Sequence, residues 1–290
     1  MMNKPLIAIS GASGFIGQQL CKYFAGKYKI ILISRTANHK HNIYSWDDIC
    51  KLPEILNTTA CVINLAGANI GDKRWSSRRK DIILNSRLDT TAKLIQILNK
   101  LDSRPDFLCA SAVGVYPTNG VYDEYSKLNY NQYNSFSEMV TKQWERVTQN
   151  YYGRVVNMRF GVVTSSYGGA LNKILLPFKF GVACGIQDSN WGFSWISSVD
   201  LCNAIDYLIE HKDISGPINL VAPQIITYSQ LIGTISGVYE GKLRLNLPRW
   251  VIKLLFGEMG QELLLSGQRV RPQKLIEHNF HFKYPNIESC

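Results

Sequence analysis

Apolar positions along the chain alternate between short unbroken runs and helical spacing, and this alternation predicts its secondary structure. Short apolar runs bounded by polar residues, Gly or Pro predict buried strands. They lie at 6–10, 28–34, 60–67, 105–112, 154–163 and 216–222. Apolar residues that recur every three or four positions predict helices. These helical stretches lie at 15–25, 78–101, 135–147, 199–211, 228–239 and 248–265.

Strands that alternate with helices predict a parallel sheet covered by helices on both faces. We therefore predict an α/β fold, a Rossmann-type doubly wound parallel sheet with a smaller C-terminal substrate-binding portion. After residue 165 the sequence becomes rich in Gly and aromatic residues and less regular. The expected domains are thus 1–165 and 166–290, with 195–212 a candidate segment for folding back onto the first.

A glycine-rich turn joins the first predicted strand to the first predicted helix. Its sequence, SGASGFIG, spaces Gly11, Gly14 and Gly17 three residues apart. Gly11 permits a tight turn, Gly14 lets the backbone approach a pyrophosphate, and Gly17 allows close packing of helix on strand. A plain strand-to-helix turn is the alternative, but the flanking elements favour a dinucleotide site at the helix N-terminus. The predicted contact residues are Gly11, Ser13, Gly14, Phe15, Ile16 and Gly17.

The end of the second predicted strand distinguishes NAD from NADP. An NAD site places Asp or Glu there to bind the ribose 2′-hydroxyl, whereas this chain has Ser34, Arg35 and Thr36, followed by Lys40. Arg35 can bind a 2′-phosphate through charge-assisted hydrogen bonds. We therefore predict NADP(H) as the cofactor and NAD(H) as the weaker alternative. A solvated arginine at the start of a loop is the structural alternative for Arg35.

Charge and composition narrow the possible partners. The 290-residue chain has 32 Lys and Arg against 22 Asp and Glu, a net charge of +10, which suits nucleic acid or phosphorylated small molecules. The densest basic stretch, at 72–80, contains one Trp and lacks the repeated aromatic residues of a single-strand platform, so we expect a small-molecule ligand and no nucleic acid. The chain has neither a long apolar run nor a secretory signal, so we expect a cytoplasmic protein without a membrane partner. Seven scattered cysteines without CxxC spacing predict neither disulfides nor a metal site.

Several motifs together resemble the extended short-chain dehydrogenase/reductase superfamily, also called the NAD-dependent epimerase/dehydratase family. They are GASGFIG, VINLAGANIGDKRW, NSRLDTTAKLIQIL, SAVGVY and SWISSVDL. The late stretch from Gly257 to Pro285 is similar to its atypical, YfcH-like branch. The resemblance implies oxidoreductase or epimerase chemistry and a homodimer through two long helices, one of them at 135–150.

The resemblance also implies further cofactor contacts and a substrate lid. The loop after the strand at 60–67 would line the adenosine side, and the end of the run at 105–112 would pass beneath the nicotinamide. The end of the strand at 154–163 would close over the nicotinamide, and 165–195 would form the lid. The implied contact residues are Asn64, Leu65, Ala66, Gly67, Ala110, Ser111, Arg159 and Phe160.

The family's usual catalytic groups are absent at the corresponding positions. Members that carry out chemistry use a Ser and a Tyr-x-x-x-Lys pair, in which Lys assists proton transfer by Tyr. In register with Glu145, the Tyr and Lys positions carry Ser137 and Thr141, and the Ser position carries Ala112. A Ser or Thr hydroxyl is a poor general acid or base at neutral pH.

Other residues near the expected substrate are candidates for proton transfer. They are Tyr116, Ser111, Asp123 and Glu124, each with a structural role as the alternative. The sequence therefore predicts an NADP(H)-binding epimerase- or oxidoreductase-like protein that acts on an unknown small substrate. The alternative is a non-catalytic NADP(H)-binding sensor or scaffold.

Overall fold

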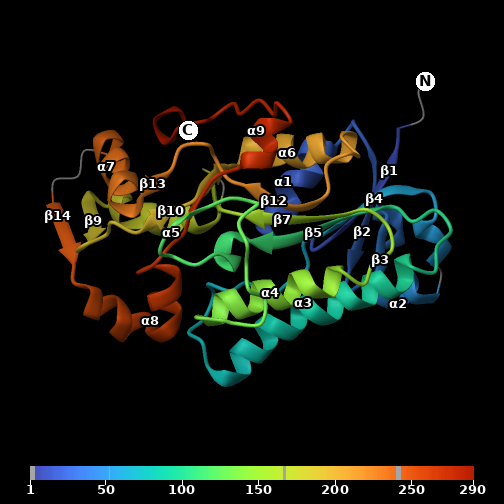
Figure 1. Cartoon of the computed structure of the whole chain (residues 1–290), viewed down its shortest axis with the longest axis horizontal. Helices are drawn as coiled ribbons and strands as arrows, with labels where there is room; N and C mark the ends of the chain where they lie inside the picture. The colour runs from blue at the N-terminus through green and yellow to red at the C-terminus, as the bar shows by residue number, and fades with distance from the viewer. Residues whose placement is uncertain (1–3, 52, 166–167, 240–242) are drawn as a thin grey trace.

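A seven-stranded parallel sheet forms the centre of the protein in the computed structural model, which describes residues 4–51, 53–165, 168–239 and 243–290. The strand order is β12-β7-β5-β4-β1-β2-β3 (Figure 1). The strands are β1 (Leu6–Ser10), β2 (Lys29–Ser34), β3 (Ile43–Ser45), β4 (Thr59–Asn64), β5 (Asp106–Ala112), β7 (Val155–Phe160) and β12 (Gly216–Leu220). This order reverses beside β1 and β4, and in such sheets ligands bind outside the carboxyl ends of the strands at the reversal.

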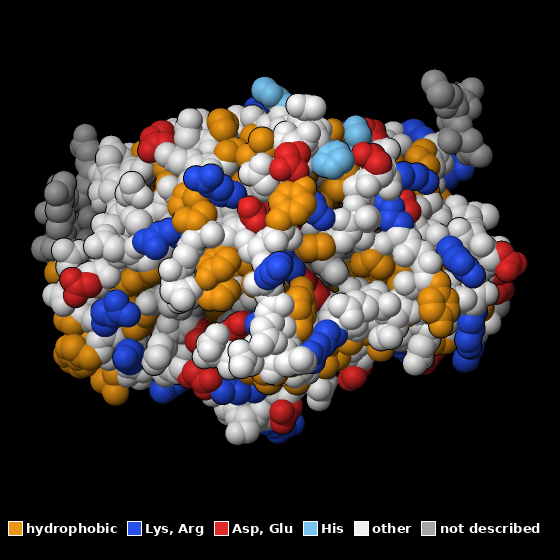
Figure 2. Space-filling view, viewed as in Figure 1, with side chains coloured by type: hydrophobic (Ala, Val, Ile, Leu, Met, Phe, Trp, Pro, Cys, Tyr) orange, Lys and Arg blue, Asp and Glu red, His pale blue; other side chains and the backbone are white. Residues whose placement is uncertain are grey.

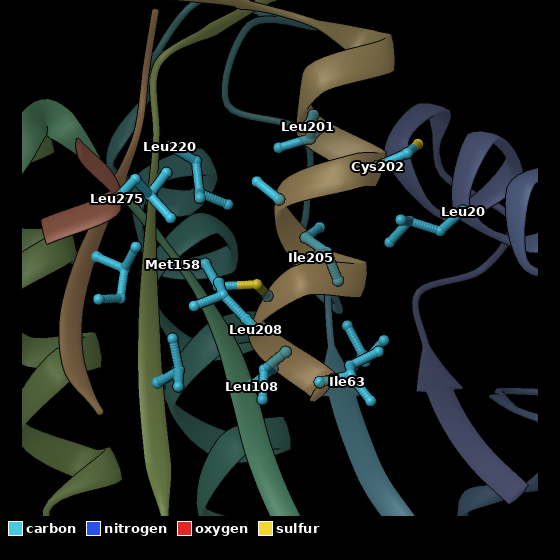
Figure 3. Packing of buried hydrophobic residues seen from close by; sticks show 14 of the residues in the cluster. Leu20, Ile63, Leu108, Met158, Leu201, Cys202, Ile205, Leu208, Leu220 and Leu275 are labelled. Carbon is cyan, nitrogen blue, oxygen red and sulfur yellow. The ribbon is translucent and has the colours of Figure 1, made fainter. Parts of the chain in front are cut away.

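Helices cover both faces of the sheet (Figure 1). On one face lie α1 (Phe15–Phe24), α6 (Ser198–Glu210) and α9 (Gln273–Glu277). On the other lie α2 (Trp46–Lys51), α3 (Ser77–Leu98) and α4 (Phe136–Thr148). Because side chains alternate along a strand, Ile7 and Ile9 of β1 enter the first core and Ala8 enters the second. Figure 3 shows the first core, in which Leu201, Ile205 and Leu208 of α6 lie among the side chains of the strands and Cys202 lies toward Leu20 of α1.

The C-terminal portion has a hydrophobic core of its own, which includes Trp195, Tyr228 and Ile252. Its helices are α5 (Ala170–Lys179), α7 (Tyr228–Val238) and α8 (Arg249–Leu263). Four short strand pairs complete the described structure: β9 (Val182–Ile186) with β14 (Leu243–Leu247), β10 (Gly192–Phe193) with β13 (Ile226–Thr227), β11 (Trp195–Ser197) with β8 (Val162–Thr164), and β15 (Arg269–Val270) with β6 (Val121–Tyr122). Short 3₁₀ turns lie at His39–His41, Pro53–Leu56, Val113–Val115 and Ile287–Ser289.

The predicted α/β fold is confirmed, and the predicted elements lie close to the observed ones. The run at 154–163 differs, because the chain leaves β7 at Gly161 and continues as β8, which pairs with β11 instead. The segment 195–212 lies partly in α6, against α1 and the sheet. The strand that follows, β12, joins the sheet beside β7, so the sheet uses residues on both sides of the expected boundary at 165. The two-domain division stays a prediction.

Surface features add two observations. Lys and Arg side chains are spread over the face in Figure 2 rather than gathered in one patch. None of the helices in the described part of the chain combines the length and apolar character needed to cross a membrane.

Candidate cofactor site

Two of the three turn glycines are required by the packing of the chain itself. Gly11 has a φ of +75°, and a Cβ there would lie 2.6 Å from the carbonyl carbon of Leu65. A Cβ on Gly17 would lie 2.5 Å from the carbonyl oxygen of Gly11. Real Cβ atoms do not approach other atoms this closely, so the first and third glycines let α1 and the loop after β4 pack tightly beside the turn.

Gly14 differs, because the chain itself barely crowds it. Its φ of −74° suits any residue, and a Cβ would meet the carbonyl oxygen of Gly11 at 3.3 Å but no other described atom beyond its chain neighbours within 4 Å. Gly14 is the N-cap of α1, and no side chain among the described residues caps this helix end. The first N–H groups of a helix have no intrahelical partners and attract anions. The turn therefore fits a pyrophosphate, with exposed Ser13 and half-buried Phe15 and Ile16 beside it.

Phe15 joins this turn to the start of the expected lid. A Cβ on Gly168 would lie 2.8 Å from the Phe15 ring, and one on Gly169 would lie 3.1 Å from it. Gly169 also has a φ of +85° and precedes α5 directly. The two glycines therefore let α5 begin against the ring at the start of α1. Residues 166 and 167 of the expected lid lie outside the described residues.

Arg35 lies where the sequence places a 2′-phosphate contact. It directly follows β2, which ends at Ser34. Arg35 and Thr36 are exposed, and Ser34 is half-buried. Within the described ranges the Arg35 side chain has no hydrogen bond or ion pair, so its donors are available to an external anion.

Asn64 stabilises the loop after β4 rather than offering its side chain to a ligand. The residue is fully buried. Its Oδ1 accepts from the Ser10 hydroxyl at 2.6 Å and from the Ala66 N–H at 3.2 Å. Its Nδ2 donates to Thr91 at 2.9 Å. The amide thus ties β1 and α3 to the loop.

Gly67 leaves room for Arg87 of α3 in this loop, with half-buried Leu65 and Ala66 preceding it. A Cβ on Gly67 would lie 3.2 Å from the guanidinium carbon of Arg87. Arg87 donates to the carbonyl oxygens of Ala68 and Ile83, and burial lowers its pKa to about 10. This arginine therefore supports the loop from inside the protein.

A buried ionic network lies beside the carboxyl end of β5. Glu145 of α4 pairs with Arg159 of β7 through two hydrogen bonds of 2.8 Å, and these side chains are 3% and 2% exposed. The Ser111 hydroxyl donates to Glu145 at 2.7 Å, and the Tyr130 hydroxyl donates to it at 2.5 Å. Burial opposes the charge of Arg159, but its bonds to Glu145 outweigh that effect and raise its pKa. Arg159 and Ser111 are therefore enclosed, next to Ala110 and Phe160 at the strand ends.

Tyr116 belongs to the same network and faces away from solvent. It is 1% exposed, accepts a hydrogen bond from Arg159 at 2.5 Å and donates one to Asn219 of β12 at 2.9 Å. Burial raises its pKa to about 12. In this arrangement the hydroxyl is engaged on both sides and cannot reach a substrate.

The two acidic candidates after β6 also support local structure. Asp123 accepts from the Tyr125 N–H and the Ser126 hydroxyl within its own turn. Glu124 is 7% exposed and accepts from the backbone N–H groups of Asn219 and Gln273 at 2.9 and 3.0 Å. Burial raises the pKa of Glu124 despite these bonds. Its carboxylate joins β12 to the start of α9.

Comparison with known proteins places this architecture in a family. The model of the NAD dependent epimerase/dehydratase family matches residues 7–221. The chain belongs to this epimerase/dehydratase family. A second model, a domain of unknown function (DUF1731), matches residues 247–290. Epimerase family protein SH2119 of Staphylococcus haemolyticus is 31% identical over 97% of this chain and 95% of its own length. Epimerase family protein SSP1921 of Staphylococcus saprophyticus is 32% identical over 97% and 96%.

Solved structures of epimerase-family proteins have the same architecture. The human epimerase family protein SDR39U1 (isoform 2) with NADPH superposes with a TM-score of 0.87 and 26% identity, over 98% of this chain and 97% of that one. A nucleoside-diphosphate sugar epimerase from Corynebacterium glutamicum superposes with a TM-score of 0.78 and 24% identity, over 99% of this chain and 57% of that one. The second likeness supports the fold alone.

Within this epimerase-family fold, α4 begins beside the carboxyl end of β5. Its Ser137 Cβ lies 3.7 Å from where a Cβ on Gly114 would stand, and Gly114 comes two residues after β5. Thr141, one turn later, is 5% exposed and donates to the carbonyl oxygen of Ser137 at 2.9 Å. These are the positions at which the sequence places the family's Tyr and Lys.

A residue that sequence reasoning missed contacts this position. Glu262 of α8 accepts from the Phe136 N–H at 2.9 Å, the Ser137 N–H at 2.9 Å and the Ser137 hydroxyl at 2.6 Å. Glu262 and Ser137 are 125 residues apart along the chain. The available signal was the late stretch from Gly257 to Pro285, which contains Glu262, but spacing alone does not place it against α4.

Proposed function

We propose that the protein is an NADP(H)-dependent oxidoreductase or epimerase-like enzyme acting on a small substrate. The cofactor would lie along the carboxyl ends of β1, β2, β4 and β5. The observation that carries the proposal is the uncapped start of α1 at Gly14, because its N–H groups and open backbone face suit a pyrophosphate.

NADP(H) is preferred to NAD(H) because of the end of β2. Arg35 is exposed there, and a guanidinium is well suited to a 2′-phosphate. The human relative was solved with NADPH, which supports the same choice. Ser34 and Thr36 would add hydroxyl contacts.

The bound cofactor would supply hydride transfer at its nicotinamide ring. The residues of the chain would hold and orient it: the start of α1 at the pyrophosphate, Arg35 at the ribose phosphate, and the loop 64–67 on the adenosine side. The Glu145–Arg159 pair would keep the floor beside β5 rigid.

A non-catalytic NADP(H)-binding sensor or scaffold is the second candidate. The favouring observation is that Tyr116 is buried while the positions of the family's Tyr and Lys carry Ser137 and Thr141. A panel of carbonyl compounds and nucleotide sugars, assayed by NADPH oxidation, separates the two functions. Turnover of any member supports the enzyme, and silence across the whole panel supports the sensor.

Fluorescence titration with NADPH and NADH tests the cofactor assignment. We expect NADPH to bind more tightly, and Arg35→Asp to weaken NADPH about 10- to 100-fold because it replaces an attractive charge at the 2′-phosphate with a repulsive one. Lys51→Asp, the same charge change at the exposed end of α2, is the matched control and should change the NADPH Kd less than about twofold. Equal affinity for NADH and NADPH in the parent protein would contradict the assignment.

The homodimer through 135–150 stays a proposal.

Helix α8, outside that segment, carries a separate group of exposed apolar side chains. Trp250, Leu254 and Leu255 are each more than half exposed there. Sedimentation of the full chain measures the oligomeric state directly.

A further inference from the structure

Helix α8 carries two carboxylates, one turn apart, to the start of α3 and α4. Glu258 pairs with Lys80 in the first turn of α3 at 2.5 Å. Glu262 binds the first N–H groups of α4. Residues four apart lie on one face of a helix, so one face of α8 contacts the starts of both α3 and α4. Figure 1 shows α8 next to the start of α4.

Gly257 sets the direction of this face. It interrupts α8 with a φ of +60° and a ψ of −141°. A Cβ on Gly257 would lie 3.2 Å from a guanidinium nitrogen of Arg74. Because this backbone conformation favours glycine, the kink before Glu258 and Glu262 is built into the sequence.

The place that Glu262 reaches is where reacting groups are expected in this fold. Ser137 packs beside Gly114, two residues after the carboxyl end of β5. Ligands of open α/β sheets bind outside these strand ends. Glu262 is half-buried there, and its three donors leave about one of the four acceptor positions of a carboxylate free, whereas Tyr116 and Glu124 are enclosed.

We propose that the Glu262 carboxylate is the proton-transferring group of this site, held in place by Ser137 as a positioning residue. The inference rests on the proposed function. When a substrate hydroxyl is oxidised, its O–H bond breaks and the proton passes to the carboxylate. The adjacent C–H bond breaks with hydride transfer to NADP⁺, and a C=O bond forms. In reduction the carboxylic acid returns the proton to the carbonyl oxygen as NADPH supplies the hydride.

The geometry suits this role, because the three donors on α4 fix both oxygens of the carboxylate. A proton acceptor must be held within hydrogen-bond reach of the group that it serves. Glu262 also comes from the C-terminal portion, whose core is separate from the two sheet cores. The acid–base group would thus arrive together with the part of the chain that would enclose the substrate.

The first test measures charge near the nicotinamide and needs no known substrate. The oxidised ring is positively charged and the reduced ring is neutral, so a nearby carboxylate strengthens NADP⁺ binding selectively. We expect Glu262→Gln to weaken NADP⁺ about three- to tenfold in calorimetric titrations and to change NADPH less than about twofold. Glu258→Gln, one turn earlier on α8, is the matched control and should leave both Kd values unchanged.

The outcomes separate this inference from the proposed function. Thermal unfolding first shows that Glu262→Gln is folded. If its ratio of the NADP⁺ and NADPH Kd values then equals that of the parent protein, the role of Glu262 is overturned and cofactor binding stands. A parent protein that binds neither dinucleotide overturns both. Ser137→Ala should shift the ratio in the same direction by a smaller factor, because the carboxylate loses one of its three donors; a purely structural bond would change only the melting temperature.

The second test uses the substrate panel. For any compound that the parent protein turns over, Glu262→Gln should lower kcat at least about 100-fold while KM changes less, as expected for loss of a general acid or base. Turnover equal to that of Glu258→Gln overturns the proton-transfer role. A panel without any substrate supports the sensor and overturns the inference together with the enzyme.

Discussion

Two helices begin at the carboxyl end of the sheet, and they differ in what binds their first N–H groups. Helix α1 follows its N-cap residue Gly14, and within the described ranges this start has no side-chain cap. Helix α4 follows its N-cap residue Ser135, whose side chain accepts from the Glu138 N–H. The Glu262 carboxylate accepts from the two preceding N–H groups, those of Phe136 and Ser137. Unpaired helix N–H groups attract negative charge in both cases. The proposed function assigns an external anion to the start of α1, whereas the chain itself supplies the anion for α4.

The largest expected effect tests whether the turn at α1 is shaped by the chain itself. Gly11→Ala should lower the free energy of unfolding by about 3 kcal/mol, because it adds both a strained positive φ and a clash with the Leu65 backbone. Urea unfolding measures this change. Gly26→Ala is the control: Gly26 has a φ of +89° but nothing within 4 Å of its Cβ position, so about 1 kcal/mol is expected. If Gly11→Ala and Gly26→Ala lost the same unfolding free energy, the clash with the Leu65 backbone would be disproved.

The next effect tests whether the start of α1 is reserved for an anion. Gly14→Asp should weaken NADPH binding about 100-fold, because a carboxylate would compete with the pyrophosphate for the helix N-terminus. The same change should leave the melting temperature equal or higher, since Asp is a favourable N-cap. Gly14→Ser, an uncharged N-cap of similar size, should lose less affinity in the same fluorescence titration. Undiminished NADPH affinity in Gly14→Asp would place the pyrophosphate elsewhere.

The smallest effect concerns the start of α4. Glu262→Ala should cost about 1–2 kcal/mol of unfolding free energy, because two backbone N–H groups and a hydroxyl lose their acceptor. Glu258→Ala should cost less than about 1 kcal/mol, because its pair with Lys80 is only partly buried, at 46% and 29% exposed. Chemical unfolding of both variants gives the comparison. A larger loss for Glu258→Ala would reverse the assigned importance of the two carboxylates.

Much of the fold could be predicted from local patterns. The runs at 6–10, 105–112 and 216–222 are buried strands, and the spacing at 15–25 is α1. The three residues of β3 are too few to show a period. Helix α5 does have helical spacing, at Leu171, Ile174, Leu175 and Phe178, but Pro177 and the glycine-rich flanks favour an irregular stretch. The exchange of partners at Gly161 also depends on β11, which lies over thirty residues further along the chain.

The catalytic candidates show where local reasoning fails. Tyr116, Asp123 and Glu124 follow β5 closely and carry suitable chemistry, so the sequence favours them equally. The packing of β12 against this loop encloses Tyr116 together with Arg159 of β7, and β12 and α9 enclose Glu124. Burial is decided by segments between 43 and 149 residues away, and no window of neighbouring residues contains that information.

The sequence by itself therefore determined the order of strands and helices, the glycine turn and the arginine at the end of β2, because periodicity and turn chemistry act between neighbouring residues. The tertiary structure decided which polar groups are buried in the Glu145–Arg159 network and which remain accessible. It also brought Glu262 to Ser137, since a hydrogen bond across 125 residues forms only after α8 packs against α4. The uncapped start of α1 thus follows from the local sequence, whereas the start of α4 is completed only by tertiary packing.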